Sequence, residues 1–186
     1  INNYSITWKD IQKSLLDNEV AIEFMNYPYF EFDTDKFVYG AIAIRKDWEE
    51  PKFIILKKES IINHYFKKTQ DSIRYTPTNS PRANLLSSPV KSENGNELFK
   101  CIWESFIVYD YIKPGDNIYF SASGILHQIP IESLPIGDGK IMSDVYNMHR
   151  LSSTRELVKE KKEMKYTKAA LYGGLNYDMT DSELLA

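Results

Sequence analysis

Residues 119–135 read YFSASGILHQIPIESLP, a stretch that brings Ser121, Ser123, Gly124 and His127 close together. A nucleophilic serine usually sits on a sharp strand-to-helix turn of the Gly-x-Ser-x-Gly type, with a base in hydrogen-bonding reach. Here no glycine stands two positions before either serine. The sequence instead predicts a turn between two strands at Ser123-Gly124, with Gly124 at positive φ. His127 is then expected on the return strand, as a partly buried side chain bonded to the backbone.

The chain before this stretch alternates between amphipathic helices and apolar strands. Residues 7–17 predict a short helix, because Ile11 and Leu15 lie at helical spacing behind a capping hydroxyl. Further elements are expected as strands over Glu19–Met25, Lys36–Arg45 and Lys52–Leu56 and as a helix over 60–68. Gly40 and Ala41 are small enough for close packing. Links that contain Pro and charged residues predict an antiparallel meander of the three strands.

Residues 71–96 differ in composition from the predicted helices and strands around them, because they contain several prolines, Gly95 and many Ser and Asn residues. They predict a long flexible connector within the domain. Glu97–Ile112 follows as the strongest helical pattern, and the Pro-Gly-Asp sequence at 114–116 ends it. Asn117–Ser121 is then expected as a buried strand.

The pattern continues beyond residue 135. Residues 137–140 (GDGK) predict a hairpin turn, and 141–151 are expected to be extended. Ser153 and Glu156 form a capping-box pattern that predicts a helix to about Lys162, before a strand over 168–172. Strands alternating with helices predict an α/β layered fold, with helices covering a mixed sheet that is incomplete at its C-terminal side.

Composition narrows the classes of function. A length of 186 residues predicts one domain, and a net charge of −3 with a pI near 5.7 offers no basic field for nucleic acid. No apolar run reaches the roughly 18–20 residues of a spanning helix, so no membrane partner is expected. No signal-peptide pattern opens the chain, and a cytoplasmic location is predicted. A first residue other than Met is expected to mark a fragment or a processed product.

Cys101 is the only cysteine, which excludes an internal disulfide and a multi-Cys zinc site. It falls in the middle of the predicted helix 97–112, away from any helix N-terminus that would lower its pKa. A lone cysteine on an amphipathic helix usually packs as a small core residue. We therefore do not expect a nucleophile here.

Other polar groups give no complete site. His64 and His149 lack a second ligand at helical spacing, so no metal is predicted. The acidic stretches contain Asp33, Asp35, Asp178, Asp181 and Glu183 and lack the ligand alternation of a calcium loop. The pair at 173–174 (Gly-Gly) lacks the further Gly or Lys-Ser/Thr of a phosphate cradle. The residues thus predict no catalytic, metal or cofactor site.

Several strings together resemble a CHAT domain, the caspase-like module often found beside tetratricopeptide repeats. They are EVAIEF at 19–24, YGA at 39–41, the helix around Leu98, Ile102 and Trp103, the break at 114–116, the stretch 118–135, LSSTREL at 151–157 and ALYGGL at 170–175. They span nearly the whole chain in the family's order. The stretch 118–135 is the most specific of them.

The resemblance implies a cysteine endopeptidase of the caspase and separase clan, with a Cys–His dyad on an α/β sheet. In that family the histidine lies in a later His-x-x-x-His-Gly type motif and the cysteine in a Ser-Ala-Cys type motif. This sequence contains neither motif. Residues 1–186 therefore resemble the front half alone, inactive by itself and without cofactor. His127 matches no catalytic position, so the opening stretch is predicted to be scaffold.

The implied partners are the C-terminal catalytic half of the same protein, a specific protein substrate and neighbouring tetratricopeptide repeats. The resemblance also suggests a bacterial regulatory or defence pathway. An alternative is a non-catalytic pseudo-protease module that binds a partner through an edge strand. A third hypothesis, a serine hydrolase using Ser123 and His127, predicts that Ser123→Ala abolishes turnover. We expect no turnover to abolish.

Overall fold

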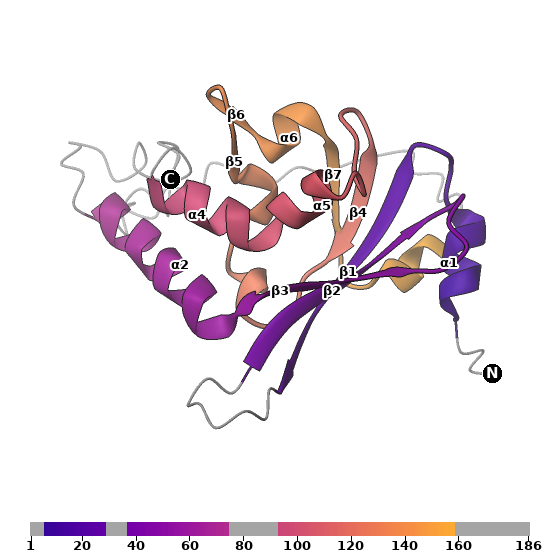
Figure 1. The fold of residues 1–186 in the computed structure, drawn as a ribbon, viewed down its shortest axis with the longest axis horizontal. Coiled ribbons are helices and arrows are strands. Elements are labelled where there is room, and N and C mark those ends of the chain that lie inside the picture. The colour runs from indigo at the N-terminus through magenta and orange to yellow at the C-terminus, as the bar shows by residue number, and fades with distance from the viewer. Residues whose placement is uncertain (1–5, 29–36, 75–92, 159–186) are drawn as a thin grey trace, which may run out of the picture.

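A computed structural model describes residues 6–28, 37–74 and 93–158 (Figure 1). Its strands are β1 (Glu19–Pro28), β2 (Phe37–Arg45), β3 (Lys52–Lys58), β4 (Asn117–Ser121), β5 (Pro135–Gly137), β6 (Lys140–Ile141) and β7 (Asn147–Leu151). Its α-helices are α1 (Trp8–Ser14), α2 (Glu59–Arg74), α4 (Glu93–Ile102), α5 (Glu104–Val108) and α6 (Met142–Val145), and its 3-10 helices are η2 (Gly124–His127), η3 (Ile131–Ser133) and η4 (Thr154–Val158). The protein is mixed α/β, as predicted.

In the described residues, five strands form one mixed sheet in the order β3-β2-β1-β4-β7. β1 is antiparallel to β2 and β2 to β3, which confirms the predicted meander, whereas β1, β4 and β7 are parallel. A Cβ at Gly40 would lie 3.1 Å from the Phe53 ring and 3.2 Å from the Ile54 carbonyl oxygen. The close packing predicted at Gly40 is thus confirmed.

The main core lies on the face of the sheet that α2, α4 and α5 cover (Figure 1). The rings of Trp103, Phe106 and Phe120 lie 5.5, 6.0 and 6.5 Å from the ring of Phe24. Edge-to-face pairs of this kind add to the large area that buried aromatic side chains remove from water. The Trp103 indole N–H donates to the Ile131 carbonyl at 2.8 Å, so this buried donor is satisfied.

The opposite face carries a smaller core beneath α1. Ile11 and Leu15 pack there on Ala21 and Ile44. The helix begins at Trp8, after the N-cap residue Thr7, whose backbone N–H and hydroxyl donate to the Asp10 carboxylate at 2.9 and 2.6 Å. The predicted cap and helix are confirmed, although the helix ends at Ser14 rather than at residue 17.

A buried ion pair joins the end of β2 to the turn that precedes β4. Arg45, at the end of β2, donates from Nη1 to the Asp116 carboxylate at 2.6 Å, and both side chains are about nine-tenths buried. The same guanidinium donates to the carbonyls of Asp17 and Tyr111 at 3.1 and 3.3 Å. The Lys113 N–H donates to the same carboxylate. Asp116 thus fixes the turn that leads into β4.

The connector predicted over 71–96 is wrong at both ends. α2 continues to Arg74 and α4 begins at Glu93, whereas residues 75–92 lie outside the described part. The first turn of α4 is polar and contains Gly95, which is buried. Packing between α2 and α4 therefore outweighs the low helix propensity of Gly and Asn in this turn.

The single helix predicted over 97–112 is divided. α4 ends at Ile102, α5 begins at Glu104, and Trp103 lies between them with its side chain fully buried. The second piece ends at Val108, followed by Asp110 at φ 54°. The apolar spacing continues through the break, so the periodicity does not indicate it.

The segment after residue 135 is partly as predicted. The hairpin turn at 137–140 joins β5 to β6, but 141–151 is not continuously extended, because α6 precedes β7. The capping box is displaced by one residue: the Glu156 carboxylate accepts from the N–H and hydroxyl of Ser152, whereas Ser153 Oγ accepts from the Arg155 N–H at 3.3 Å. The remainder of the helix predicted to Lys162 and the strand at 168–172 lie outside the described residues.

Candidate functional site

The stretch 119–135 leaves the carboxyl end of β4 and turns into η2 and η3. Gly124 has φ +52°, as predicted, but no return strand follows. Leu126, Ile129 and Ile131 are all fully buried, and their burial draws the chain into short turns. The prediction of a second strand here is wrong because period-2 patterning in so short a segment does not separate a strand from successive turns.

Tyr39 determines the path of the chain at Gly124. Its hydroxyl oxygen accepts the Ile125 N–H at 2.8 Å, and its side chain is fully buried. A Cβ at Gly124 would lie 2.1 Å from that oxygen. Burial raises the pKa of the Tyr39 hydroxyl above its usual value, so the group stays neutral. The glycine is thus required both for its dihedral angle and for this close approach.

The serines and the histidine of the stretch do not form a catalytic group. Ser121 Oγ donates to the Ser152 carbonyl at 3.0 Å, and Ser123 Oγ is buried with no hydrogen-bond partner among the described residues. His127 is exposed and makes no hydrogen bond within the described residues, so its predicted burial and backbone bond are wrong. A nucleophile and its base need direct contact. The described part of the chain shows no such contact here.

Arg150 of β7 holds the turns in place. Its Nη2 donates to the Ile129 carbonyl at 2.9 Å and to the Glu132 carboxylate at 2.6 Å. The guanidinium lies 5.2 Å from the centre of the Phe120 ring. Planar geometry and several donors suit arginine to such a clamp. Sequence reasoning missed this residue, since an isolated arginine gives no periodic signal.

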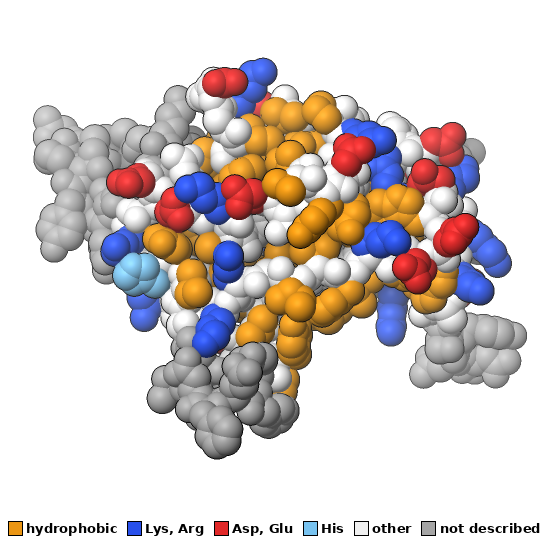
Figure 2. Space-filling view, in the orientation of Figure 1, with side chains coloured by type: hydrophobic (Ala, Val, Ile, Leu, Met, Phe, Trp, Pro, Cys, Tyr) orange, Lys and Arg blue, Asp and Glu red, His pale blue; other side chains and the backbone are white. Residues whose placement is uncertain are grey.

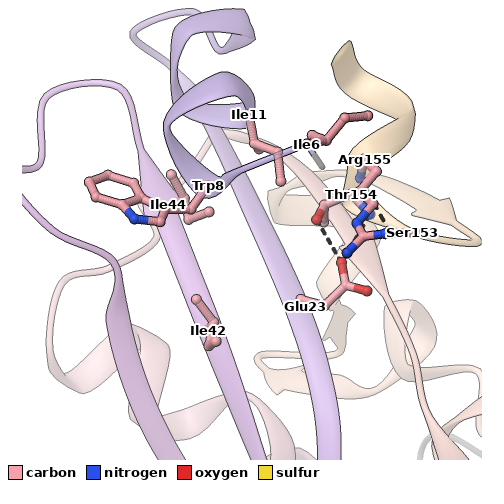
Figure 3. Close-up of a pocket in the computed structure, with 9 residues that line it drawn as sticks. All are labelled: Ile6, Trp8, Ile11, Glu23, Ile42, Ile44, Ser153, Thr154 and Arg155. Atoms are coloured by element: carbon pink, nitrogen blue, oxygen red, sulfur yellow. Dashed lines mark hydrogen bonds between the residues drawn. The ribbon is translucent and has the colours of Figure 1, made fainter. Parts of the chain in front are cut away.

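The outer face of the sheet contains a hollow of about 290 Å³ between α1 and η4 (Figure 3). Its walls are Ile6, Trp8, Ile11, Glu23, Ile42, Ile44, Ser153, Thr154 and Arg155. Glu23 Oε2 accepts hydrogen bonds from the Thr154 N–H and hydroxyl at 2.9 and 2.6 Å. This carboxylate therefore attaches η4 to β1, a role that the sequence did not suggest.

Cys101 is 4% exposed, and burial raises the pKa of its thiol to about 11. The neutral thiol therefore persists at physiological pH and does not act as a thiolate nucleophile. Its predicted place in the core is confirmed.

The remaining histidines have aromatic neighbours. His149 stacks on Tyr119 with ring centres 4.8 Å apart, and the Tyr119 hydroxyl donates to Glu19 at 3.1 Å. His64 lies edge-on to Tyr65 at 5.3 Å. Over the described ranges, no three ligand-type side chains gather in a way that could hold a metal ion. The acidic residues at 33, 35, 178, 181 and 183 and the glycines at 173–174 lie outside those ranges.

β7 is the last strand of the sheet on the β4 side. The Asn147 N–H donates to the Asp116 carbonyl at 2.9 Å, so Asn147 directs its backbone toward β4. Successive residues of a strand direct their backbone groups to opposite sides, so Met148 and Arg150 direct theirs away from β4. Among the described residues no strand pairs with that side.

No family model matches the chain, and no curated protein matches its sequence. Among the residues that the structure describes, none of the helices has the length and apolar character needed to cross a bilayer.

Proposed function

We propose that the chain is the front segment of a CHAT-type, caspase-like cysteine endopeptidase. In this proposal it supplies sheet strands and helices that support a catalytic His/Cys half outside these 186 residues. The complete enzyme cleaves a specific protein. The resemblance at 118–135 suggests this assignment, and the arrangement of the sheet supports it.

The observation that carries the proposal is the outward backbone of Met148 and Arg150 on β7. β1, β4 and β7 already run parallel, and another strand can continue the ladder at this edge. Edge strands with free N–H and C=O groups readily pair with another chain. A catalytic half that docks here continues the same sheet beyond β7.

The chemistry of the described residues agrees with a supporting role. The thiol of Cys101 is buried and neutral, and His127 lies on the surface without a partner in the described part of the chain. Catalysis by a cysteine needs a thiolate, an imidazole and an oxyanion donor. The proposed enzyme therefore takes its dyad from the other half.

The test combines this chain with the polypeptide encoded directly after it and measures complex formation by size-exclusion chromatography. Met148→Pro removes an outward N–H while leaving the ladder to β4 intact, so we expect loss of the complex. Met148→Ala is the matched control, because it also removes the side chain but keeps the N–H. Absence of a complex with the unaltered chain would overturn the proposal.

The alternative is a non-catalytic binding module. It is favoured if the sequence encoded next lacks the Ser-Ala-Cys and His-Gly motifs, whereas their presence favours the enzyme. A binding module requires a surface that recognises another protein. The opposite edge of the sheet supplies a candidate.

A further inference from the structure

Three aromatic side chains gather where two surface links of the chain meet. Trp48 lies in the link between β2 and β3, and Tyr109 and Tyr111 lie in the link between α5 and β4. The centre of the Tyr111 ring lies 5.2 Å from that of Trp48 and 5.7 Å from that of Tyr109. Figure 2 shows apolar side chains at the surface over α5, with charged side chains among them. We call Trp48, Tyr109 and Tyr111 the aromatic cluster.

The backbone beneath the aromatic cluster is held by contacts from other elements. The Arg45 guanidinium, already paired with Asp116, also donates to the Tyr111 carbonyl. The Trp48 N–H donates to the Arg45 carbonyl at 3.3 Å, and the side-chain amide of Gln12 donates to the carbonyls of both residues. These bonds fix the two links relative to each other. A surface that is fixed in advance loses little conformational entropy when a partner binds.

The polar atoms of the aromatic cluster are available to a partner. Tyr109 is 63% exposed, and Trp48 and Tyr111 are partly exposed. Within the described residues, neither tyrosine hydroxyl nor the Trp48 indole N–H forms a hydrogen bond, and none of them is an unbonded buried atom. The three groups are therefore open to solvent, and each can donate to a carbonyl of a partner.

A proline-rich segment has the chemistry that complements these groups. Proline has no backbone N–H, so a run of prolines forms a polyproline II helix whose carbonyl groups have no internal partner. Its pyrrolidine rings pack against aromatic rings, and its preformed shape keeps the entropy cost of binding low. One turn of this helix advances about 9 Å over three residues. Two ring-to-ring steps of 5.2 and 5.7 Å can span that length.

The inclination of the rings favours such a segment over a carbohydrate. The Tyr111 ring is inclined by 66° to the Trp48 ring and by 34° to the Tyr109 ring. The cluster is therefore ridged, whereas a sugar ring stacks best on a flat aromatic surface. A pyrrolidine ring can insert between rings that are inclined to one another.

We propose that the aromatic cluster binds a proline-rich protein segment in the polyproline II conformation. Pyrrolidine rings of the segment pack between the three aromatic rings. The Trp48 indole N–H and the two tyrosine hydroxyls donate to its carbonyl groups. The cluster contains no residue of β7, and the proposal does not depend on the peptidase assignment.

The probe is acetyl-decaproline-amide, titrated into the isotope-labelled chain and followed by NMR spectroscopy. The Trp48 indole N–H resonance should shift and reach saturation. The Trp103 indole N–H is the internal control and should not shift, because it is buried and already donates to the Ile131 carbonyl. A Gly-Ser peptide of the same length lacks pyrrolidine rings and should bind at least about tenfold more weakly. Absence of a saturable Trp48 shift at millimolar decaproline, or equal affinity for the Gly-Ser peptide, would overturn the proposal.

The chain variants separate the rings from the donors, with affinity measured from the amide resonances of residues 109–111. Tyr109→Ala removes the most exposed ring of the cluster and should weaken binding at least about tenfold. Trp48→Phe keeps an aromatic ring but removes the indole N–H, and should weaken binding about threefold to tenfold. Phe53→Ala removes a 54% exposed aromatic side chain from β3 and is the matched control, which should bind like the unaltered chain. Equal affinities of Tyr109→Ala and Phe53→Ala would contradict the proposal.

Two further results would identify a different occupant and contradict the proposal. A Trp48 shift with cellohexaose but not with decaproline would identify a carbohydrate site. Self-association of the unaltered chain that Tyr109→Ala abolishes, without binding of decaproline, would identify a second copy. An unchanged Trp103 indole resonance shows in each experiment that the main core is intact.

Discussion

At the residue scale, Gly124 fixes the path of the chain in the stretch 119–135. An alanine there would need a left-handed backbone and would also meet the Tyr39 hydroxyl. We expect Gly124→Ala to lower the free energy of unfolding by about 3 kcal/mol. Gly139→Ala is the matched control, since Gly139 has φ +73° and no heavy atom within 4 Å of a built Cβ. It should cost about 1 kcal/mol.

The contact with Tyr39 can be separated from backbone strain by a double-mutant cycle in thermal and urea unfolding. Tyr39→Phe removes the oxygen that an alanine at 124 would meet, at the cost of the bond to the Ile125 N–H. The double variant should therefore lose less stability than the sum of the two single variants. Simple additivity would show that the close approach has no energetic effect.

Asp110 occupies a position that favours glycine. It lies at φ 54°, directly after the last turn of α5, where its N–H donates to the Ile107 carbonyl at 3.0 Å. The Tyr111 N–H donates to the Phe106 carbonyl at 2.8 Å, which completes a Schellman motif. Asp110→Gly should stabilise the protein by about 1 kcal/mol. A lower melting temperature would contradict this reading.

The thiol of Cys101 provides a test by chemical reactivity. Because its pKa is raised to about 11, iodoacetamide at pH 8 should modify it far more slowly in the native protein than in guanidinium. The raised pKa also makes the free energy of unfolding depend on pH. The contribution of the thiol to stability is fully present below the unfolded pKa near 9.0. This contribution should decline as the pH rises from about 9 to about 11. Rapid native alkylation would place the thiol on the surface.

At the scale of elements, Arg150 connects β7 to η2 and η3. Arg150→Met keeps much of the side-chain stem but removes the bonds to the Ile129 carbonyl and Glu132. We expect a loss of about 2 kcal/mol in the free energy of unfolding, the usual size for charge-assisted bonds. Arg150→Lys is the matched control, and it should restore only part of this loss because it lacks the planar fork. An unchanged free energy of unfolding in Arg150→Met would show that η2 and η3 keep their conformation without these bonds.

The sequence predicted the elements whose signal is local. The first helix with its cap, the strands of the meander and the positive φ of Gly124 all follow from spacing and turn chemistry. It did not predict the break at Trp103, because the buried indole interrupts the helix through tertiary packing. The return strand expected at His127 was wrong for a similar reason, since Tyr39 and Arg150 act on it from distant strands.

Long-range polar contacts were the part of the candidate site that sequence reasoning could not reach. Glu23 and Thr154 are far apart in the chain, yet their bonds attach η4 to β1. Arg45 and Asp116 likewise meet only after folding. A single sequence gives no pairing information for such residues, whereas hydrophobic periodicity is visible in every window.

At the scale of the whole molecule, the sheet has one face under α2, α4 and α5 and two edges of different character. The β7 edge continues a parallel set, and the β3 edge closes an antiparallel meander with exposed apolar side chains. We assign the first of these edges to the catalytic half of the proposed peptidase. The two edges are separated by the three strands β2, β1 and β4.

The central claim is that β7 receives the catalytic half. Amide hydrogen exchange of this chain, measured alone and after mixing with the polypeptide encoded next, tests it most directly. The account predicts that the Met148 and Arg150 amides become protected while the Asn147 and His149 amides, already bonded to β4, stay unchanged. Unchanged exchange at Met148 and Arg150 in a verified complex would contradict it.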